Sequence, residues 1–369
     1  MTFDVPIATD EGKTIVGPVG CEILVDEPCT LHSLGSRHHR PYEVAPDTEG
    51  SATLTHRERP YDAHTPIERA AWTFDRMPDG RPAILYPKGF EPGVLYNLVY
   101  TARDPSVVGL GFASTRDFVS CLKYETASFD VLRAGPRINR AHAFGSSQIG
   151  RFLRHLLYEG FNEDEQHRKV FDGVVANVAG AGLGSFNHRF AQPSRHASAH
   201  FDVYYPTEQF PFTDLPQSDP VTKQTSGILD RCEETDTVPR VFYTNTSTEY
   251  WNRSASLTHT DIEGQRDIDI HPSVRIYHFA GTQHGPADLP DTSDTLPGNP
   301  VNFRLVHRAL LLAIDRWVSE NQDPPPSEHG RIDQGTLVKP QDLRASWPEA
   351  GIPFPETPRD PRRLDHGPN

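Results

Sequence analysis

Apolar residues in the second half of the chain follow an order in which short strands alternate with helices. The spacing of apolar positions predicts helices over residues 113–125, 148–158 and 302–319. Short, mostly apolar runs between and after them predict strands at residues 141–144, 170–178, 240–244 and 274–279. This alternation indicates an α/β fold with a mostly parallel central sheet that has helices on both faces.

The remaining segments are expected to surround that sheet in one domain that spans residues 1–369. Residues 1–80 alternate short β-like runs with turn clusters and are expected to form a β-rich N-terminal extension. Residues 180–239 form a connection too long for an ordinary loop, which indicates a lid-like insertion. Residues 324–369 are rich in proline and are expected to form an irregular C-terminal strap.

Composition narrows the classes of partner. The 369 residues include 36 Lys+Arg and 50 Asp+Glu, a net charge of −14 that disfavours nucleic acid as a partner. An apolar run of about 18 residues, as a membrane span needs, is absent from the sequence. The first residues have neither the basic nor the apolar region of a signal peptide. The four cysteines are far apart in the sequence and do not have the spacing of a metal site. We therefore expect free thiols and a cytoplasmic location.

The strongest chemical signal lies where the strand at 141–144 gives way to the helix at 148–158. Residues Gly145 to Gly150 read Gly-Ser-Ser-Gln-Ile-Gly, close to the nucleophile elbow G-x-S-x-G but with Ile149 in place of the last glycine. A serine on such a turn presents its hydroxyl above the sheet, which favours Ser147 over Ser146 as the nucleophile. The amide of Gln148 is expected to form half of an oxyanion hole. The alternative is a tight turn with an N-cap serine.

A serine nucleophile needs a base. The chain has 18 histidines, so the candidate base is chosen by its place relative to the predicted strands and helices. His284 follows the last strand and precedes the last helix, so it can reach the same sheet edge. Three others lie within a predicted strand or helix and are expected to be structural or solvated: His142, His155 and His307. The i, i+4 pair His196 and His200 could bind zinc, but it lacks the carboxylate of a metalloprotease motif. We expect no metal and no organic cofactor.

The third group should be an acid that orients the base. Glu249 lies just after the strand at 240–244, whereas Asp261 and Asp288 are competing candidates for which surface carboxylates are the plainer interpretation. With Glu249, the three groups occur in the order serine, acid, histidine, which is the order of α/β-hydrolases.

Several long strings in the sequence resemble one known family. The chain is similar to a bacterial family of α/β-hydrolase-domain proteins, largely uncharacterised and carboxylesterase-like, from roughly residue 50 to 345. The resemblance implies the α/β-hydrolase fold, with Ser147 as nucleophile, Glu249 as acid and His284 as base. The strings that carry it are residues 90–111, 144–154, 161–173, 186–195, 244–251 and 277–285.

The expected activity is hydrolysis of a small-molecule carboxylic ester through an acyl-enzyme. Alternatives on the same fold are an acyltransferase, an amidase or a carbon–carbon bond hydrolase, and a non-catalytic binding module is a further one. Whether copies of the chain assemble into a homo-oligomer stays open. Arg103, in the turn 102–105, is the candidate second oxyanion donor. The candidate substrate-binding residues, for which core packing and a structural ion pair are the alternative, are His188, Arg189, Phe190, Tyr250 and Trp251.

Overall fold

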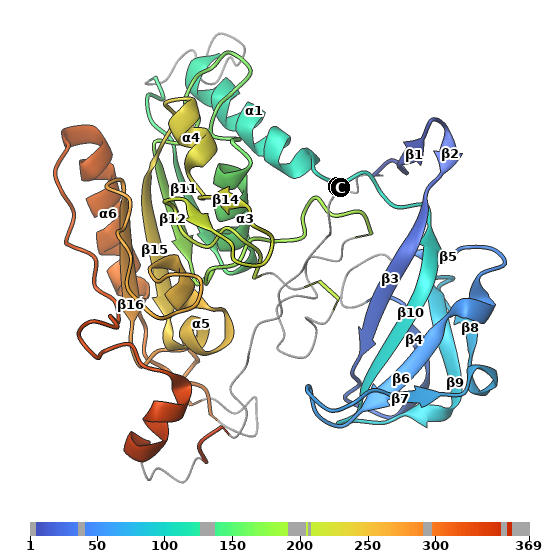
Figure 1. Ribbon diagram of the computed structural model, residues 1–369. Helices are drawn as coiled ribbons and strands as arrows, with labels where there is room; N and C mark the ends of the chain where they lie inside the picture. The colour runs from blue at the N-terminus through green and yellow to red at the C-terminus, as the bar shows by residue number, and fades with distance from the viewer. Residues whose placement is uncertain are drawn as a thin grey trace. The chain divides into compact units, whose positions relative to one another are not determined.

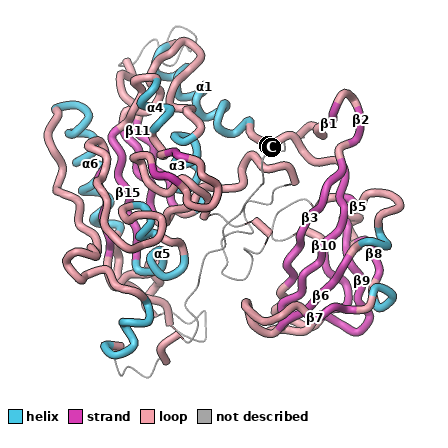
Figure 2. Tube along the Cα trace, viewed as in Figure 1, coloured by secondary structure: helices cyan, strands magenta, loops and turns pink. Residues whose placement is uncertain are grey.

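The chain folds into two compact units (Figure 1). The β-rich unit comprises Met1–Leu110 and Ser185–Thr207, and the α/β unit comprises Gly111–Gly184 and Glu208–Asn369. Strands dominate the β-rich unit, whereas the long helices belong to the α/β unit (Figure 2). This computed structural model describes residues 5–35, 41–125, 137–190, 204–205, 208–290, 297–347 and 353–355.

Two antiparallel sheets and a short hairpin form the β-rich unit. The hairpin pairs β1 (Thr9–Asp10) with β2 (Lys13–Thr14). One sheet has the order β3 (Val16–Ile23), β10 (Leu95–Arg103), β6 (Thr53–Arg57) and β7 (Thr65–Ile67), with β5 (Glu43–Val44) also paired to β10. The other sheet has the order β4 (Cys29–Ser33), β9 (Pro82–Phe90) and β8 (Thr73–Arg76).

Side chains from both sheets share one hydrophobic core. Strand β10 pairs with β3 from Tyr96 opposite Ile23 to Arg103 opposite Val16, so its apolar residues meet those of its neighbours in a fixed register. Burial of these side chains is the main stabilising term for a unit with so little helix. The fully buried members include Leu34, Leu54, Ile84, Phe90 and Leu98.

The α/β unit is built on a four-stranded parallel sheet. Its order is β11 (His142–Ser146), β12 (Gly173–Asn177), β15 (Arg240–Thr246) and β16 (Val274–Phe279). All three neighbouring pairs are parallel. The four strands expected from the sequence are therefore confirmed, and so is the parallel character of the sheet.

Helices lie on both faces of this sheet. α6 (Arg304–Glu320) covers one face, and α3 (Gln148–Tyr158) lies on the other with α1 (Leu110–Tyr124) and α4 (Asp230–Glu234) (Figure 1). On α6, Leu310, Ile314 and Trp317 recur at helical spacing and pack with sheet residues such as Phe242. The described residues also form α5 (Ser247–Asn252), the hairpin of β13 (Gln217–Ser218) and β14 (Thr225–Ser226), and short 3₁₀ helices at Glu49–Ser51, Arg69–Ala71, Ala255–Thr258 and Pro340–Ser346.

The C-terminal segment extends the sheet beyond β16. Glu328 donates its amide to the carbonyl of Ile276 at 2.9 Å, and its carbonyl accepts the amide of His278 at 2.8 Å. The hydroxyl of Tyr277 donates to the carbonyl of Pro325 at 2.8 Å. Residues 325–328, at the start of the predicted strap, therefore pair with the edge strand β16.

The boundaries of these parts differ from those read in the sequence. The β-rich part continues to Leu110 and includes Ser185–Thr207, which falls inside the predicted lid-like insertion. The arrangement of all parts as one domain stays a prediction. All four cysteines are free thiols. No helix in the described part of the chain combines the length and the apolar character that crossing a bilayer requires.

The core under α6 makes a direct test of this packing. Ile314 is fully buried, whereas Leu312 on the same helix is 64% exposed. We expect Ile314→Ala to lower the free energy of unfolding by about 2–5 kcal/mol, because the lost methyl groups leave a cavity. Leu312→Ala should change it by no more than about 0.5 kcal/mol. Urea unfolding followed by tryptophan fluorescence checks both, and equal losses would contradict this assignment of the core.

Candidate active site

Ser147 occupies a sharp turn between β11 and α3. Its backbone has φ 58° and ψ −117°, a conformation that non-glycine residues rarely adopt. The Ser147 amide donates to the carbonyl of Asn177 at 2.8 Å, which ties the turn to β12. A Cβ on Gly145 would lie 2.6 Å from the Ile149 carbonyl oxygen, and one on Gly150 would lie 2.8 Å from that of Asn177. The two glycines therefore allow the close approach that this turn requires.

Three side chains meet above the carboxyl ends of the strands. The hydroxyl oxygen of Ser147 lies 2.8 Å from Nε2 of His284, and Nδ1 of His284 lies 2.6 Å from Oε1 of Glu249. Glu249 is fully buried, whereas the His284 side chain is 47% exposed. A continuous line of hydrogen bonds thus runs from a buried carboxylate to a hydroxyl at the accessible end.

Local sequence orients the carboxylate of Glu249. α5 begins with a capping box in which the amide of Thr246 donates to Oε2 of Glu249 at 2.9 Å, and the hydroxyl of Thr246 donates to the same oxygen. The other oxygen, Oε1, contacts His284. Each carboxylate oxygen therefore has its own partner, and the plane of the group is fixed before a substrate arrives.

The first turn of α5 also holds the loop that carries His284. The hydroxyl oxygen of Ser247 accepts the Gly281 amide at 2.9 Å, and that of Thr248 accepts the His284 amide at 3.2 Å. On the other side, the Asn299 side chain donates to the Gly281 carbonyl at 2.7 Å. The acid and the backbone of the base are thus positioned by consecutive residues of a single helical turn.

Ser146 has a different environment from Ser147. Its hydroxyl oxygen accepts Nδ2 of Asn177 at 2.8 Å, while Oδ1 of Asn177 accepts the Thr244 hydroxyl at 2.9 Å. The Thr244 hydroxyl oxygen lies 3.2 Å from Nε2 of His307. Burial lowers the pKa of His307 to about 4, so this ring is neutral near pH 7. Ser146 therefore belongs to a cross-strand polar network, whereas the hydroxyl of Ser147 contacts His284.

Buried charge lies close to Glu249. Arg151, one turn along α3 from the nucleophile elbow, is 2% exposed. Burial and, to a smaller extent, the nearby Arg253 lower the pKa of Arg151, whereas Glu208 and Glu249 raise it, and the net value is about 10. Arg253 and Glu208 form a buried ion pair at 3.5 Å. Arg151 stays protonated at neutral pH, so a buried positive charge lies near the carboxylate of Glu249.

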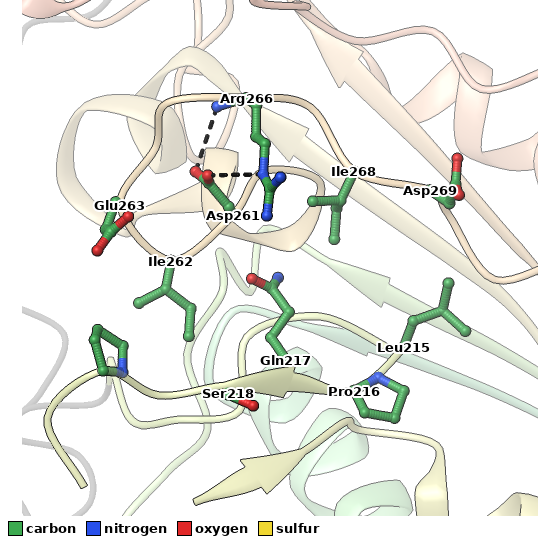
Figure 3. A pocket seen from close by; sticks show the side chains of 11 residues that line it. Leu215, Pro216, Gln217, Ser218, Asp261, Ile262, Glu263, Arg266, Ile268 and Asp269 are labelled. Carbon is green, nitrogen blue, oxygen red and sulfur yellow. Dashed lines mark hydrogen bonds and ion pairs between the residues drawn. The ribbon is translucent and has the colours of Figure 1, made fainter. Parts of the chain in front are cut away.

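The competing acid Asp261 binds other groups. Asp261 lines a pocket between its own loop and β13, where one carboxylate oxygen pairs with Arg266 at 3.2 Å (Figure 3). The other oxygen accepts the amide of Gln265 at 2.7 Å. These contacts occupy both oxygens of Asp261. The acid that contacts His284 is Glu249, and neither Asp261 nor Asp288 takes that place.

The other histidines have separate positions. His142 pairs with Asp315 at 3.1 Å, and the buried His155 pairs with Glu159 at 3.4 Å. His196 and His200, the alternative zinc pair, lie outside the described residues. Within the described ranges, no group of three or more His, Cys, Asp or Glu side chains has the geometry to hold a metal ion.

The remaining predicted site residues divide between the two units. Gln148 is the first residue of α3 and follows Ser147 directly. Arg103 ends β10 in the β-rich unit, where its guanidinium pairs with Asp104 at 3.0 Å. His188, Arg189 and Phe190 also belong to that unit.

Phe190 is part of the core of the β-rich unit. Its ring is 3% exposed and meets Tyr42 edge-on at 5.1 Å. This burial supports the packing alternative for Phe190. Tyr250 and Trp251, by contrast, lie on α5 and line a pocket of about 280 Å³.

Sequence reasoning missed the residues that support the three central side chains. Thr246 was open to detection, because Thr246 and Glu249 have the T-x-x-E spacing of a capping box. Asn177 carries no such signal, since its contacts depend on the parallel register that places it between Ser146 and Thr244.

The network around Asn177 predicts coupling between two positions. Ser146→Ala and Asn177→Ala each remove the same hydrogen bond, so their effects on the free energy of unfolding should not add. We expect a coupling energy of about 0.5–3 kcal/mol from the double-mutant cycle, measured by urea unfolding. A control cycle of Ser146→Ala with Leu312→Ala should be additive. Additivity in the first cycle to within about 0.3 kcal/mol would contradict the network.

Comparison with known proteins places this architecture in a family. Searches of curated proteins and of solved structures each found no match. The model of a family described as an alpha/beta hydrolase domain matches residues 63–356, well over half of the chain. That range includes the strand-to-helix turn at Ser147 and the loops that carry Glu249 and His284. The protein therefore belongs to the alpha/beta hydrolase domain family, which indicates a hydrolase.

Proposed function

We propose that this protein is a serine hydrolase that cleaves a small-molecule carboxylic ester through an acyl-enzyme. The observation that carries the proposal is the line of hydrogen bonds from Glu249 through His284 to Ser147, with contacts of 2.6 Å and 2.8 Å. A nucleophile, a base within hydrogen-bond reach and a group that orients the base are the parts that acyl transfer requires.

In the acylation half, the hydroxyl oxygen of Ser147 bonds to the ester carbonyl carbon while Nε2 of His284 takes its proton. The tetrahedral intermediate then collapses, and the bond to the alcohol oxygen breaks. His284 returns the proton to that oxygen, so the alcohol leaves as a neutral molecule. The product of this half is an ester between Ser147 and the acyl group.

Deacylation repeats the same steps with water as the nucleophile. His284 takes a proton from the water as it attacks the acyl carbon, and then returns the proton to the oxygen of Ser147. In both halves Nδ1–H of His284 donates to Glu249, which keeps Nε2 free to accept a proton and stabilises the charged ring. Full burial of Glu249 protects this contact from competition with water.

The developing negative charge on the carbonyl oxygen needs donors. The Gln148 amide lies at the N-terminal end of α3, where backbone N–H groups have no partner within the helix. In the proposed mechanism it donates to the oxyanion, a role worth about 3–4 kcal/mol where one such donor has been removed in other enzymes.

The nucleophile is tested by labelling with a fluorophosphonate. Ser147→Ala should abolish both labelling and hydrolysis of p-nitrophenyl acetate, because the oxygen that attacks is lost. Ser146→Ala should remain reactive, since the Ser146 hydroxyl contacts Asn177 rather than His284. Peptide mapping of the adduct to Ser146 would show the assignment to be wrong. Labelling of Ser147 without ester turnover would favour amide, transfer or carbon–carbon bond chemistry.

The acid is tested by an isosteric exchange. In Glu249→Gln, the amide oxygen should face the two donors of Thr246, which turns the NH₂ group toward Nδ1 of His284. That contact favours the tautomer with a proton on Nε2, which cannot act as a base. We expect kcat to fall by roughly 10⁴, with a smaller effect on KM.

Asp261→Asn is the matched control for this exchange and should keep near-normal kcat, because Asp261 contacts Arg266. Circular dichroism should show that both variants fold. Normal kcat in Glu249→Gln, together with a collapse in Asp261→Asn or Asp288→Asn, would place the acid on another loop.

A further inference from the structure

A second pocket lies against the helix that carries Glu249. Its volume is about 280 Å³, and its walls come from α5, β16 and the C-terminal segment 330–343. In Figure 1 this segment, drawn in red, passes beside α5 at the lower end of the α/β unit. The C-terminal segment, after its pairing with β16, therefore supplies part of the wall of this pocket.

The residues that line the pocket are different from the three central groups of the proposed mechanism. Ser247, Tyr250 and Trp251 line it, and their i, i+3, i+4 spacing places them on one face of α5. Glu249 lies between them in sequence, so its side chain leaves the helix on another side, where it contacts His284. The residues that line the pocket do not include Ser147, Glu249 or His284.

Aromatic walls give the pocket a defined shape. The ring of Tyr250 lies 4.1 Å from that of His278, centroid to centroid, and its hydroxyl lies 2.9 Å from Nε2 of His259. Trp251 meets Trp347 edge-on at 6.0 Å. These contacts hold the two α5 rings in place, so a ligand would meet a surface that is already ordered.

The lining is also free of charge. None of the eleven described residues around the pocket is Asp, Glu, Lys or Arg. Burial lowers the pKa of His278, and burial raises the pKa of Tyr250, so both side chains are neutral near pH 7. A charged ligand would lose hydration here without gaining a partner of opposite charge.

We propose that this pocket binds a neutral molecule with one or two aromatic rings. Tyr250 and Trp251 offer ring surfaces for stacking or edge contacts, and Leu337, Val338 and Leu343 add aliphatic lining. The volume is near the lower limit of ordinary ligand pockets, about 300 Å³, which suits a small ring system. Such a molecule is either the aryl part of a substrate or product, or a separate ligand.

Binding is measured by equilibrium dialysis with 2-naphthol, a neutral two-ring probe, against its anionic analogue 2-naphthoate. We expect saturable binding of one 2-naphthol per chain, and affinity for 2-naphthoate weaker by roughly tenfold or more, equivalent to about 1.4 kcal/mol. Failure of 2-naphthol to saturate, or equal affinity for the two probes, would overturn the proposal.

Substitutions then locate the site. Val338 is 41% exposed, so Val338→Trp should fill the pocket without disturbing the core and weaken 2-naphthol binding by roughly tenfold. Leu343→Glu should do the same by placing a charge against the ring. Val221→Trp, at an exposed valine outside the pocket, is the control and should leave the affinity unchanged. Normal affinity for 2-naphthol in both pocket variants would show that it binds elsewhere and would contradict the proposal.

The rate of fluorophosphonate labelling in the presence of 2-naphthol distinguishes a substrate or product from a separate ligand. Competitive slowing by 2-naphthol, with a midpoint equal to its Kd, identifies the pocket as a subsite for the substrate. Saturable binding that does not compete identifies a separate ligand. The dialysis experiment is repeated on Ser147→Ala, whose expected affinity is that of the unaltered chain. The binding proposal rests on this dialysis experiment alone. A finding that the protein is not an esterase would therefore not contradict it.

Discussion

The positive φ at Ser147 is the constraint on which the α/β unit depends. A non-glycine residue in this conformation costs on the order of 1–3 kcal/mol and persists only where its surroundings hold it. Here the Ser147 amide bonds to Asn177 of the next strand, and α3 starts immediately afterwards. The nearby glycines remove the Cβ atoms that would collide with the backbone. The strain is thus offset by the pairing of β11 with β12, so the sheet and the reactive turn stabilise each other.

The parallel register of the strands links the turn at Ser147 to the other strands of the sheet. Ser146, Asn177 and Thr244 occupy matched positions on three neighbouring strands, and their side chains bond to one another. Glu249 and His284 follow the ends of the third and fourth strands. Because all four strands end at the same edge, residues more than a hundred positions apart in sequence meet within hydrogen-bond distance.

Much of the α/β unit was predictable from sequence because its signals are local. The predicted helix 148–158 and the predicted strand 274–279 match α3 and β16 in full. The three residues that meet above the sheet were each selected by position at a strand end. Asn177 was not predicted, because its role depends on register. The burial of Phe190 was not decided either, since its partner Tyr42 is almost 150 residues away in the sequence.

The pairing of Glu328 with β16 bears on when the sheet is completed during synthesis. An unpaired sheet edge is a template for another chain, and β16 offers such an edge until residues 325–328 are added. Because a chain emerges from its N-terminus, β11, β12, β15 and β16 are all made before the segment that covers the last of them. The β16 edge of the newly made sheet therefore lacks its C-terminal cover from the appearance of β16 until the arrival of Glu328.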